Sequence, residues 1–172
     1  MSAAERLILK TLDAAVRSPG AAALIKSLAD RLDGALAQRP ASPMAWETVP
    51  LNLYGDSLPP LVRSSWVFIL RGGKASGAER HPNSHQRTMS FRGSGDVQLW
   101  AEGHWYSQRL RSEPEGVIED SWVSIPPNTW HQWVVPADHW IVVSFHTAGE
   151  EDLIEERGDP GTETVTRQGR YL

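Results

Sequence analysis

Residue types that bind metals in proteins are concentrated in one segment near the middle of the chain. Residues 73–93 read GKASGAERHPNSHQRTMSFRG and contain Glu79, His81, His85 and Gln86. Glu79 and His81 are two residues apart, and on a strand such residues project from the same face of the sheet. A carboxylate beside an imidazole is a suitable ligand pair for a divalent transition metal.

A second segment supplies a further histidine. Residues 120–135 read DSWVSIPPNTWHQWVV, and a tight turn at Pro126 to Asn128 comes immediately before His131. If the strand that starts at His131 lies beside the strand of the first segment, side chains from both segments converge on one interior point. The candidates for this point are Glu79, His81, His131 and one of His85 or Gln86.

The two segments resemble the two signature segments of the cupin superfamily, a group of small jelly-roll barrels, and the resemblance covers roughly residues 51–147. The first signature has a Gly, His-x-His, a Glu and a Gly at fixed spacings, which fall here on Gly73, Glu79, His81, Gln86 and Gly93. The second has a Gly, Pro-x-Gly, a His and often an Asn, which fall here on Asp120, Pro126, Asn128, His131 and Val135. The spacing matches throughout, and the residue identities match in part.

Two substitutions change the ligand set that the resemblance implies. Cupin metal sites usually have three His and one Glu, whereas here Glu79 replaces the first His and Gln86 replaces the Glu. Asn128 in place of the turn Gly is a mild change, because Asn tolerates a positive φ nearly as Gly does. The alternative to a metal site is a polar network that holds a ligand without a metal.

The expected cofactor is a divalent metal ion. His81, His131 and Glu79 form a set of two histidines and one carboxylate with open positions, which favours Fe(II) and is compatible with Mn, Ni or Zn. Two residues are candidates for the position beside this set, and the choice between them stays open. Strand parity favours His85, which shares a face with Glu79, whereas the cupin spacing favours Gln86.

Two further side chains are expected at a substrate pocket. Trp133 shares strand parity with His131, and His146 ends the strand that should follow it. Aromatic side chains of this kind can stack on a substrate, although most Trp residues in such a fold fill the core.

The resemblance implies an enzyme that acts on a small molecule in the barrel interior, most simply a non-haem Fe(II)-type dioxygenase or oxidoreductase, and a homodimer. Two alternatives stay open. One is an isomerase, epimerase or lyase in which a His acts as general base. The other is a non-catalytic small-molecule binding or sensor protein with a degenerate metal site.

The elements that must position these residues differ along the chain. Residues 1–40 have an apolar period of about four, which predicts two helices separated at Ser18, with Pro19 beginning the second and Ser18 placed to cap it. Residues 45–148 have a period of about two, which predicts short strands that form a barrel or sandwich, and the resemblance implies that this part is the cupin barrel. Residues 149–172 are acidic and are expected to lie over the barrel or to be partly disordered. The periods therefore predict a mainly β fold preceded by two helices, and the cupin resemblance implies that the β part is a double-stranded β-helix.

Eight strands are expected, with Gly, Pro and Asp in the breaks between them. Their predicted bounds are 51–54, 65–70, 88–92, 97–100, 104–110, 117–125, 131–135 and 139–146.

Length and composition exclude several classes of protein and of binding site. The 172 residues suit one domain, and 17 basic against 21 acidic residues give a net charge of −4, which argues against nucleic acid as a partner. The chain has no cysteine, so thiolate metal sites are excluded. No apolar run of membrane-spanning length occurs, so a soluble, cytoplasmic protein is expected. All eight Trp and all six His lie between Trp46 and His146, within the predicted barrel.

Overall fold

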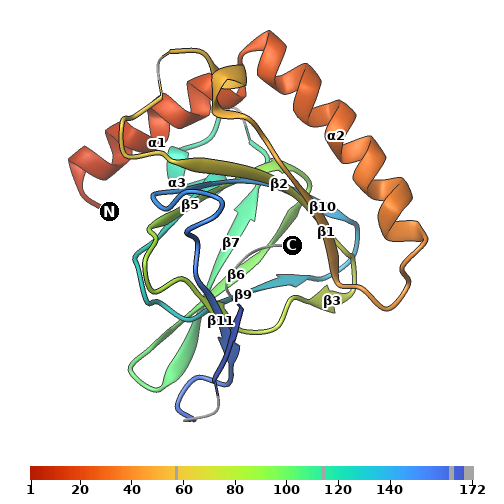
Figure 1. Cartoon of the computed structure of the whole chain (residues 1–172), viewed down its shortest axis with the longest axis vertical. Coiled ribbons are helices and arrows are strands. Elements are labelled where there is room, and N and C mark those ends of the chain that lie inside the picture. The colour runs from red at the N-terminus through yellow and green to blue at the C-terminus, as the bar shows by residue number, and fades with distance from the viewer. Residues whose placement is uncertain (57, 114, 163–164, 169–172) are drawn as a thin grey trace.

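The computed structural model describes residues 1–56, 58–113, 115–162 and 165–168. Two antiparallel sheets face each other, and two helices cover the outer face of one of them (Figure 1). The first sheet has the order β1 (Met44–Thr48), β2 (Ser64–Leu70), β10 (Trp140–His146), β5 (Gln86–Arg92), β8 (Trp122–Ile125). The second has the order β12 (Val165–Gln168), β11 (Glu155–Gly158), β4 (Glu79–Arg80), β9 (His131–Val135), β6 (Ser94–Ala101), β7 (His104–Arg111), and β3 (Lys74–Ala75) also pairs with β9.

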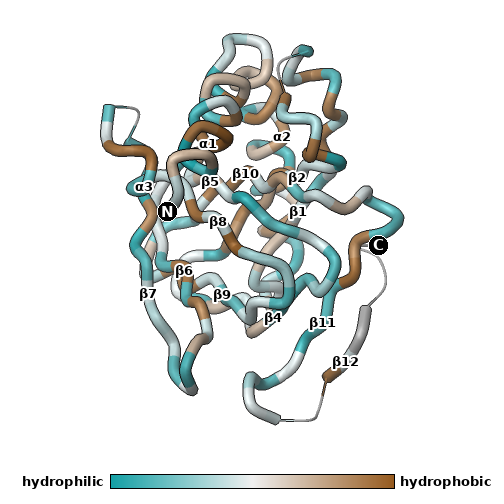
Figure 2. Tube along the Cα trace, turned by 90° about the vertical axis from the view of Figure 1, so that its left-hand side faces the viewer, coloured by the Kyte–Doolittle hydropathy of each residue, from teal (hydrophilic) through white to brown (hydrophobic). Residues whose placement is uncertain are grey.

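This arrangement confirms the expected fold class, a mainly β jelly roll preceded by two α-helices. The described strands form a sandwich of two sheets rather than a closed barrel. In the side view of Figure 2 helices α1 and α2 form the top layer, strands β5, β10 and β2 lie below them, and β6, β9 and β4 lie below those strands.

Helices α1 (Ala3–Val16) and α2 (Pro19–Ala37) begin as the sequence predicts. The Ser2 hydroxyl caps α1 by accepting a hydrogen bond from the Glu5 amide at 3.1 Å. Ser18 occupies the N-cap position of α2, but its hydroxyl donates to the Ala15 carbonyl instead of capping the helix. None of the helices in the described ranges is long and apolar enough to cross a membrane.

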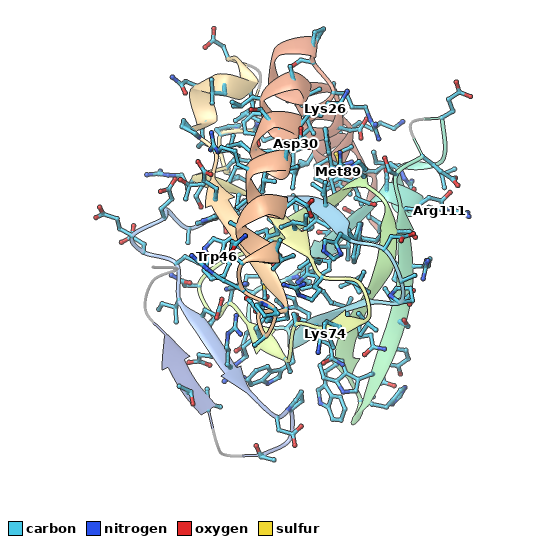
Figure 3. All side chains as sticks on the ribbon, turned by 90° about the vertical axis from the view of Figure 1, so that its right-hand side faces the viewer. Lys26, Asp30, Trp46, Lys74, Met89 and Arg111 are labelled. Carbon is cyan, nitrogen blue, oxygen red and sulfur yellow. The ribbon has the colours of Figure 1, made fainter. Side chains whose placement is uncertain are left out.

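The first sheet is covered on both faces, because the helices lie on one side and the second sheet on the other. Strands β2 and β10 are therefore buried along their whole length. On the helix side one apolar layer includes Leu12, Ile25 and Met89 (labelled in Figure 3), all fully buried. Between the sheets a second layer includes Phe68 and Trp140.

One ion pair ties α1 to the sheet. Glu5 accepts two hydrogen bonds from the guanidinium of Arg87, at 2.6 and 2.9 Å, and the Arg87 side chain is only 5% exposed. The Ser124 hydroxyl donates to the same carboxylate at 2.7 Å. Two-point contact between a guanidinium and a carboxylate fixes orientation as well as distance, so it sets where the helix lies on the strands.

Three local predictions differ from the structure. Residues 51–54, expected as a strand, form the 3-10 helix η1 (Leu51–Tyr54), because Pro50 fixes its own φ at −56° and Gly55 ends the turn with a φ of +77°. The expected strand 117–125 begins with the short helix α3 (Ile118–Ser121) and becomes a strand only at Trp122. Strands β1, β3, β11 and β12 were not predicted, and the last two lie in the segment expected to be an extension.

Two glycines test the packing of this fold. A methyl group added at Gly95 in β6 would lie 2.2 Å from the ring of the fully buried Trp140, whereas one added at Gly34 in α2 meets open space. We expect Gly95→Ala to lower the free energy of unfolding by about 1–3 kcal/mol through overpacking. Gly34→Ala should raise it by about 0.5–1 kcal/mol through helix propensity. Urea unfolding of both variants measures the two effects, and unchanged stability in Gly95→Ala would contradict the close packing of Trp140.

Candidate metal centre

Three ligand-type side chains meet between the two sheets. Glu79 lies on β4, His81 directly follows that strand, and His131 begins β9. Glu79 and His131 are ladder partners, and the rings of His81 and His131 have centroids 5.4 Å apart. One ligand atom from each residue lies within 4.8 Å of the other two, and the three residues are only 4, 3 and 0% exposed. The structure therefore brings together Glu79 and His81 of the first segment and His131 of the second, as expected from the sequence.

The turn before β9 fixes the approach of the second segment. Asn128 adopts the positive φ of +64° that its position in the turn requires. In this conformation its backbone N–H donates a hydrogen bond to the backbone carbonyl oxygen of His81 at 2.9 Å. The turn thus holds the backbone of one candidate ligand while it leads the chain into His131.

Hydrogen bonds to the backbone determine which ring nitrogen of each histidine faces the centre. His131 Nδ1 lies 3.0 Å from the Thr129 carbonyl, and His81 Nδ1 lies 3.2 Å from the Ile154 carbonyl. A carbonyl can only accept, so each Nδ1 carries the proton and donates it. In the neutral ring the lone pair is then on Nε2, which is the arrangement typical of metal-binding histidines.

One contact in the cluster places two acceptors opposite each other. His131 Nε2 and Glu79 Oε1 are 3.5 Å apart, which is too long for a good hydrogen bond. Within the described part of the chain, no group satisfies the buried Nε2 of His131 by hydrogen bonding. Two lone pairs at this separation repel unless a cation lies between them, either a proton on the ring or a metal ion.

Burial and neighbouring charges set the protonation states. Burial alone would raise the pKa of Glu79, but His131, His81 and Arg157 outweigh it and lower the pKa below its ordinary value. Burial, together with the neighbouring His131, lowers the pKa of His81 to about 4. Burial also lowers the pKa of His146 well below its ordinary value. At neutral pH the centre thus has an ionised Glu79 beside a neutral His81, the protonation states that metal binding requires of these two ligands.

Gln86 lies inside the sandwich, as the cupin spacing predicts. It begins β5 opposite His146 of β10, and its side-chain amide donates to the hydroxyls of Thr88 at 3.1 Å and Ser144 at 3.3 Å. Its carbonyl oxygen Oε1 is buried and has no hydrogen-bond partner among the residues that the structure describes. An uncommitted acceptor is therefore present on the strand next to the cluster.

His85 lies outside the cluster, so the parity argument for it does not hold. Its Nε2 is 2.7 Å from the Ser124 hydroxyl and 3.9 Å from Glu5, on the helix side of the first sheet. The reason is that β4 ends at Arg80 and the chain turns into the other sheet before β5 begins at Gln86. Residues 79 and 85 are therefore not on one strand, and alternation along a strand does not relate them.

The two residues expected at a substrate pocket lie against the cluster. Trp133 contacts the ring of His131 edge-on, with centroids 6.0 Å apart. His146 contacts the ring of His81 in the same way at 5.0 Å, and its Nδ1 is 3.3 Å from the Ser84 hydroxyl. Both residues are buried, and their contact with a substrate stays a prediction.

Known proteins resemble this chain in structure only. No protein-family model matches it, and no curated protein matches its sequence significantly. Pumpkin seed globulin matches the structure with a TM-score of 0.51 at 18% identity, over 68% of this chain and 28% of the globulin. The fold is that of a cupin.

Other structures with this cupin fold match less closely. Oxalate oxidase in complex with the substrate analogue glycolate has a TM-score of 0.46 at 17% identity, over 61% of this chain and 51% of that chain. The coconut allergen cocosin has a TM-score of 0.48 at 15% identity, over 66% of this chain and 28% of that chain. This chain therefore spans about half the length of oxalate oxidase and less than a third of the two seed proteins.

Two residues of this cupin centre were missed in the sequence because they lie in the C-terminal segment. Arg157 Nη2 is 3.3 Å from Glu79 Oε2, and the Ile154 carbonyl accepts from His81. Both residues are more than 70 positions from their partners. The register of β11 on β4 brings them there, and no local pattern in the acidic C-terminal segment indicates that pairing.

The low pKa of His81 makes stability depend on pH. The unfolded chain binds a proton at His81 below pH 6.5, whereas the folded chain binds it only near pH 4, so stability falls as pH falls through this window. For the metal-free protein we expect His81 to account for about 2 kcal/mol of stability lost between pH 7 and pH 5. Urea unfolding at the two pH values measures this loss.

A matched pair of variants assigns the effect. His81→Leu should remove this part of the pH dependence, whereas His104→Leu, which changes an exposed histidine on β7, should keep it. Equal pH dependence in wild type and His81→Leu would contradict a neutral, buried His81.

Proposed function

We propose that this protein is a metal-dependent enzyme that acts on a small molecule, most simply a non-haem Fe(II)-type dioxygenase. The observation that carries the proposal is the buried meeting of Glu79, His81 and His131 with their ligand atoms within 4.8 Å of one another. Two histidines and one carboxylate with open positions are the ligand set typical of non-haem Fe(II) oxygenases.

The donor atoms fit a divalent ion in type and in protonation. The hydrogen bonds from Nδ1 leave the Nε2 lone pairs of His81 and His131 directed to the centre, and Glu79 is ionised. A cation between His131 Nε2 and Glu79 Oε1 would turn their repulsion into attraction. Mn, Ni or Zn would be compatible with the same donors, and the side chains alone do not distinguish them from Fe(II).

The residues around the centre have separate roles in this proposal. When bound, Fe(II) supplies a redox centre with open positions for substrate and dioxygen chemistry. Gln86 Oε1, an acceptor without a partner among the described residues, would orient a donor group of the substrate or a water molecule. Trp133 and Trp140 pack edge to face beside His131 and keep bulk water from the ligands.

A hollow of about 620 Å³ at the open edge of the sandwich has the size of a small-molecule site. It lies where β8 and β7, the edge strands of the two sheets, face α1 (Figure 2). Leu99 lines this hollow and is the ladder partner of His131, so one side chain links the hollow to the centre. His85 and Ser124 give its wall hydrogen-bonding groups, which suits a polar small molecule.

A non-catalytic binding protein is the second candidate, and burial favours it. The side chains of Glu79 and His131 are 5 and 0% exposed, so a substrate reaches them only if a neighbouring side chain such as Leu99 moves. A protein that only binds a metabolite in the hollow needs no contact between that metabolite and the buried residues. Oxygen uptake distinguishes the two candidates.

Metal loading tests the proposal directly. Apo-protein loaded with Fe(II) without oxygen should bind one ion per chain, and His81→Ala and His131→Ala should each lose stoichiometric binding because each removes a ligand. His85→Ala is the matched control, since His85 lies in the same segment but on the other side of the sheet, and it should keep one ion per chain. Metal analysis after gel filtration gives the stoichiometry.

Oxygen consumption by the loaded protein is then measured with small aromatic, thiol and keto-acid compounds. Uptake that wild type and His104→Ala, a change of an exposed histidine on β7 outside the hollow, both show and His131→Ala lacks supports the dioxygenase. Stoichiometric metal that persists in both His81→Ala and His131→Ala contradicts the assignment of the centre, and metal binding without oxygen uptake supports the second candidate.

A further inference from the structure

The C-terminal segment from Asp152 to Gly158 contacts two of the three candidate ligands. The carbonyl of Ile154 accepts a hydrogen bond from His81 Nδ1 at 3.2 Å, and Arg157 Nη2 donates to Glu79 Oε2 at 3.3 Å. In Figure 2 the strands β9, β4 and β11 follow one another in the lower layer, in the order that the ladder gives. The segment therefore lies beside the ligand strand on the side away from His131.

Several bonds hold this segment in place independently of the centre. The side chain of Asn83 donates to the Asp152 carbonyl at 2.7 Å and accepts from the Ile154 amide at 3.0 Å. On the outer face of the same strands, Arg80 forms an ion pair with Glu156 at 2.7 Å. Since these contacts do not involve the ligands, the position of β11 is fixed by the fold.

The register of β11 places a cation opposite the ligand carboxylate. Arg157 and Glu79 are direct ladder partners, so their side chains project from the same face of the sheet. Arg157 Nε also donates to Glu155, a buried residue two positions earlier on the same face. The guanidinium is held from behind by Glu155 and extends one nitrogen to Glu79.

This contact gives the two carboxylate oxygens of Glu79 different partners. Oε2 is taken by Arg157 at 3.3 Å, whereas Oε1 is the oxygen 3.5 Å from His131 Nε2. A carboxylate bound in this way offers one oxygen to an ion. Groups that hold a ligand through its second atom orient it and raise metal affinity.

We propose that Arg157 is a positioning residue of the metal centre, which holds Glu79 so that only Oε1 faces the ion. The inference rests on the proposed metal-binding function and adds to it the coordination mode of Glu79. One-oxygen coordination keeps one more position on the ion open for water or substrate than two-oxygen coordination does.

Binding of Mn²⁺, followed by electron paramagnetic resonance, tests the role of Arg157 without a substrate. Arg157→Met should weaken Mn²⁺ binding about 10–100-fold, and Arg157→Lys should recover part of the loss because it restores the charge. Arg80→Met is the matched control, because it removes an Arg–Glu pair between the same two strands on the face away from the centre. It should leave the Mn²⁺ affinity within about twofold of wild type.

The number of water molecules on the ion tests the coordination mode. Broadening of the Mn²⁺ signal in ¹⁷O-enriched water should show one water fewer in Arg157→Met than in wild type, because the released carboxylate can bind through both oxygens. Should Arg157→Met fold poorly by circular dichroism, the comparison of Arg157→Lys with Arg80→Lys gives the same test with the charge kept. A role limited to strand pairing would move both of these variants equally.

The outcomes separate this inference from the proposed function. Equal Mn²⁺ affinity and equal water number in wild type and Arg157→Met overturn the positioning role and leave the metal centre standing. Equal losses in Arg157→Met and Arg80→Met also overturn it. A wild-type protein that takes up no Mn²⁺, Fe(II) or Zn²⁺ overturns both proposals.

Discussion

The constraint on which the rest of this structure depends is the burial of the Glu79 carboxylate between two sheets. An ionised carboxylate taken out of water is costly unless charge and hydrogen bonds replace its hydration. Arg157 pairs with one oxygen, and the other faces His131 Nε2, where a proton on the ring or a cation between the two atoms would complete the compensation. The strands that carry these residues, β11 and β9, flank β4 on its two sides. The strand order of the second sheet is thus the arrangement that compensates this charge.

The first sheet separates two environments whose chemistry differs. Along β5 and the residue before it, odd-numbered residues such as His85 and Arg87 face the helices, and even-numbered residues such as Gln86 face the interior. On the helix side, polar groups are used to dock α1, through the contact of Glu5 with Arg87. On the interior side, polar groups lie around the candidate metal centre. Neighbouring residues on one strand therefore have unrelated roles. The helical segment lies on the other side of the first sheet from the centre, so it contributes no His or Trp side chain to it.

The sequence predicts the centre well where its geometry is local. Glu79 and His81 are two residues apart, and the turn that contains Asn128 delivers His131 to a fixed position, so spacing alone is enough to relate them. His85 fails the same reasoning because a change of sheet intervenes, and parity applies only within one strand. The cupin spacing includes such a change of sheet, and Gln86 is buried in the interior as that spacing implies, while its contact with a metal stays a prediction.

The sequence could not indicate the contacts that join distant segments. Arg157 and Ile154 reach their partners through the register of a four-residue strand, and a strand this short, rich in charge, has no apolar alternation to reveal its pairing. The prediction of a strand at residues 51–54 was wrong for a different reason. The composition of the residues between Pro50 and Gly55 is compatible with a strand and with a 3-10 turn alike. Fold class and ligand identity are thus encoded locally, whereas ligand orientation depends on tertiary contacts.

The shortness of β4 explains why that orientation needs a distant segment. β4 has two residues and shares one ladder pair, Glu79 with His131, with its neighbour β9. A strand held only by a single pair on one side can tilt about that pair. A tilt of the strand also displaces the carboxylate oxygens of Glu79 relative to His131. β11 adds two further pairs on the other side, so that β4 becomes an internal strand. The candidate ligands thus come from the two segments in the middle of the chain, whereas two of the three ladder pairs that hold β4 come from the C-terminal segment.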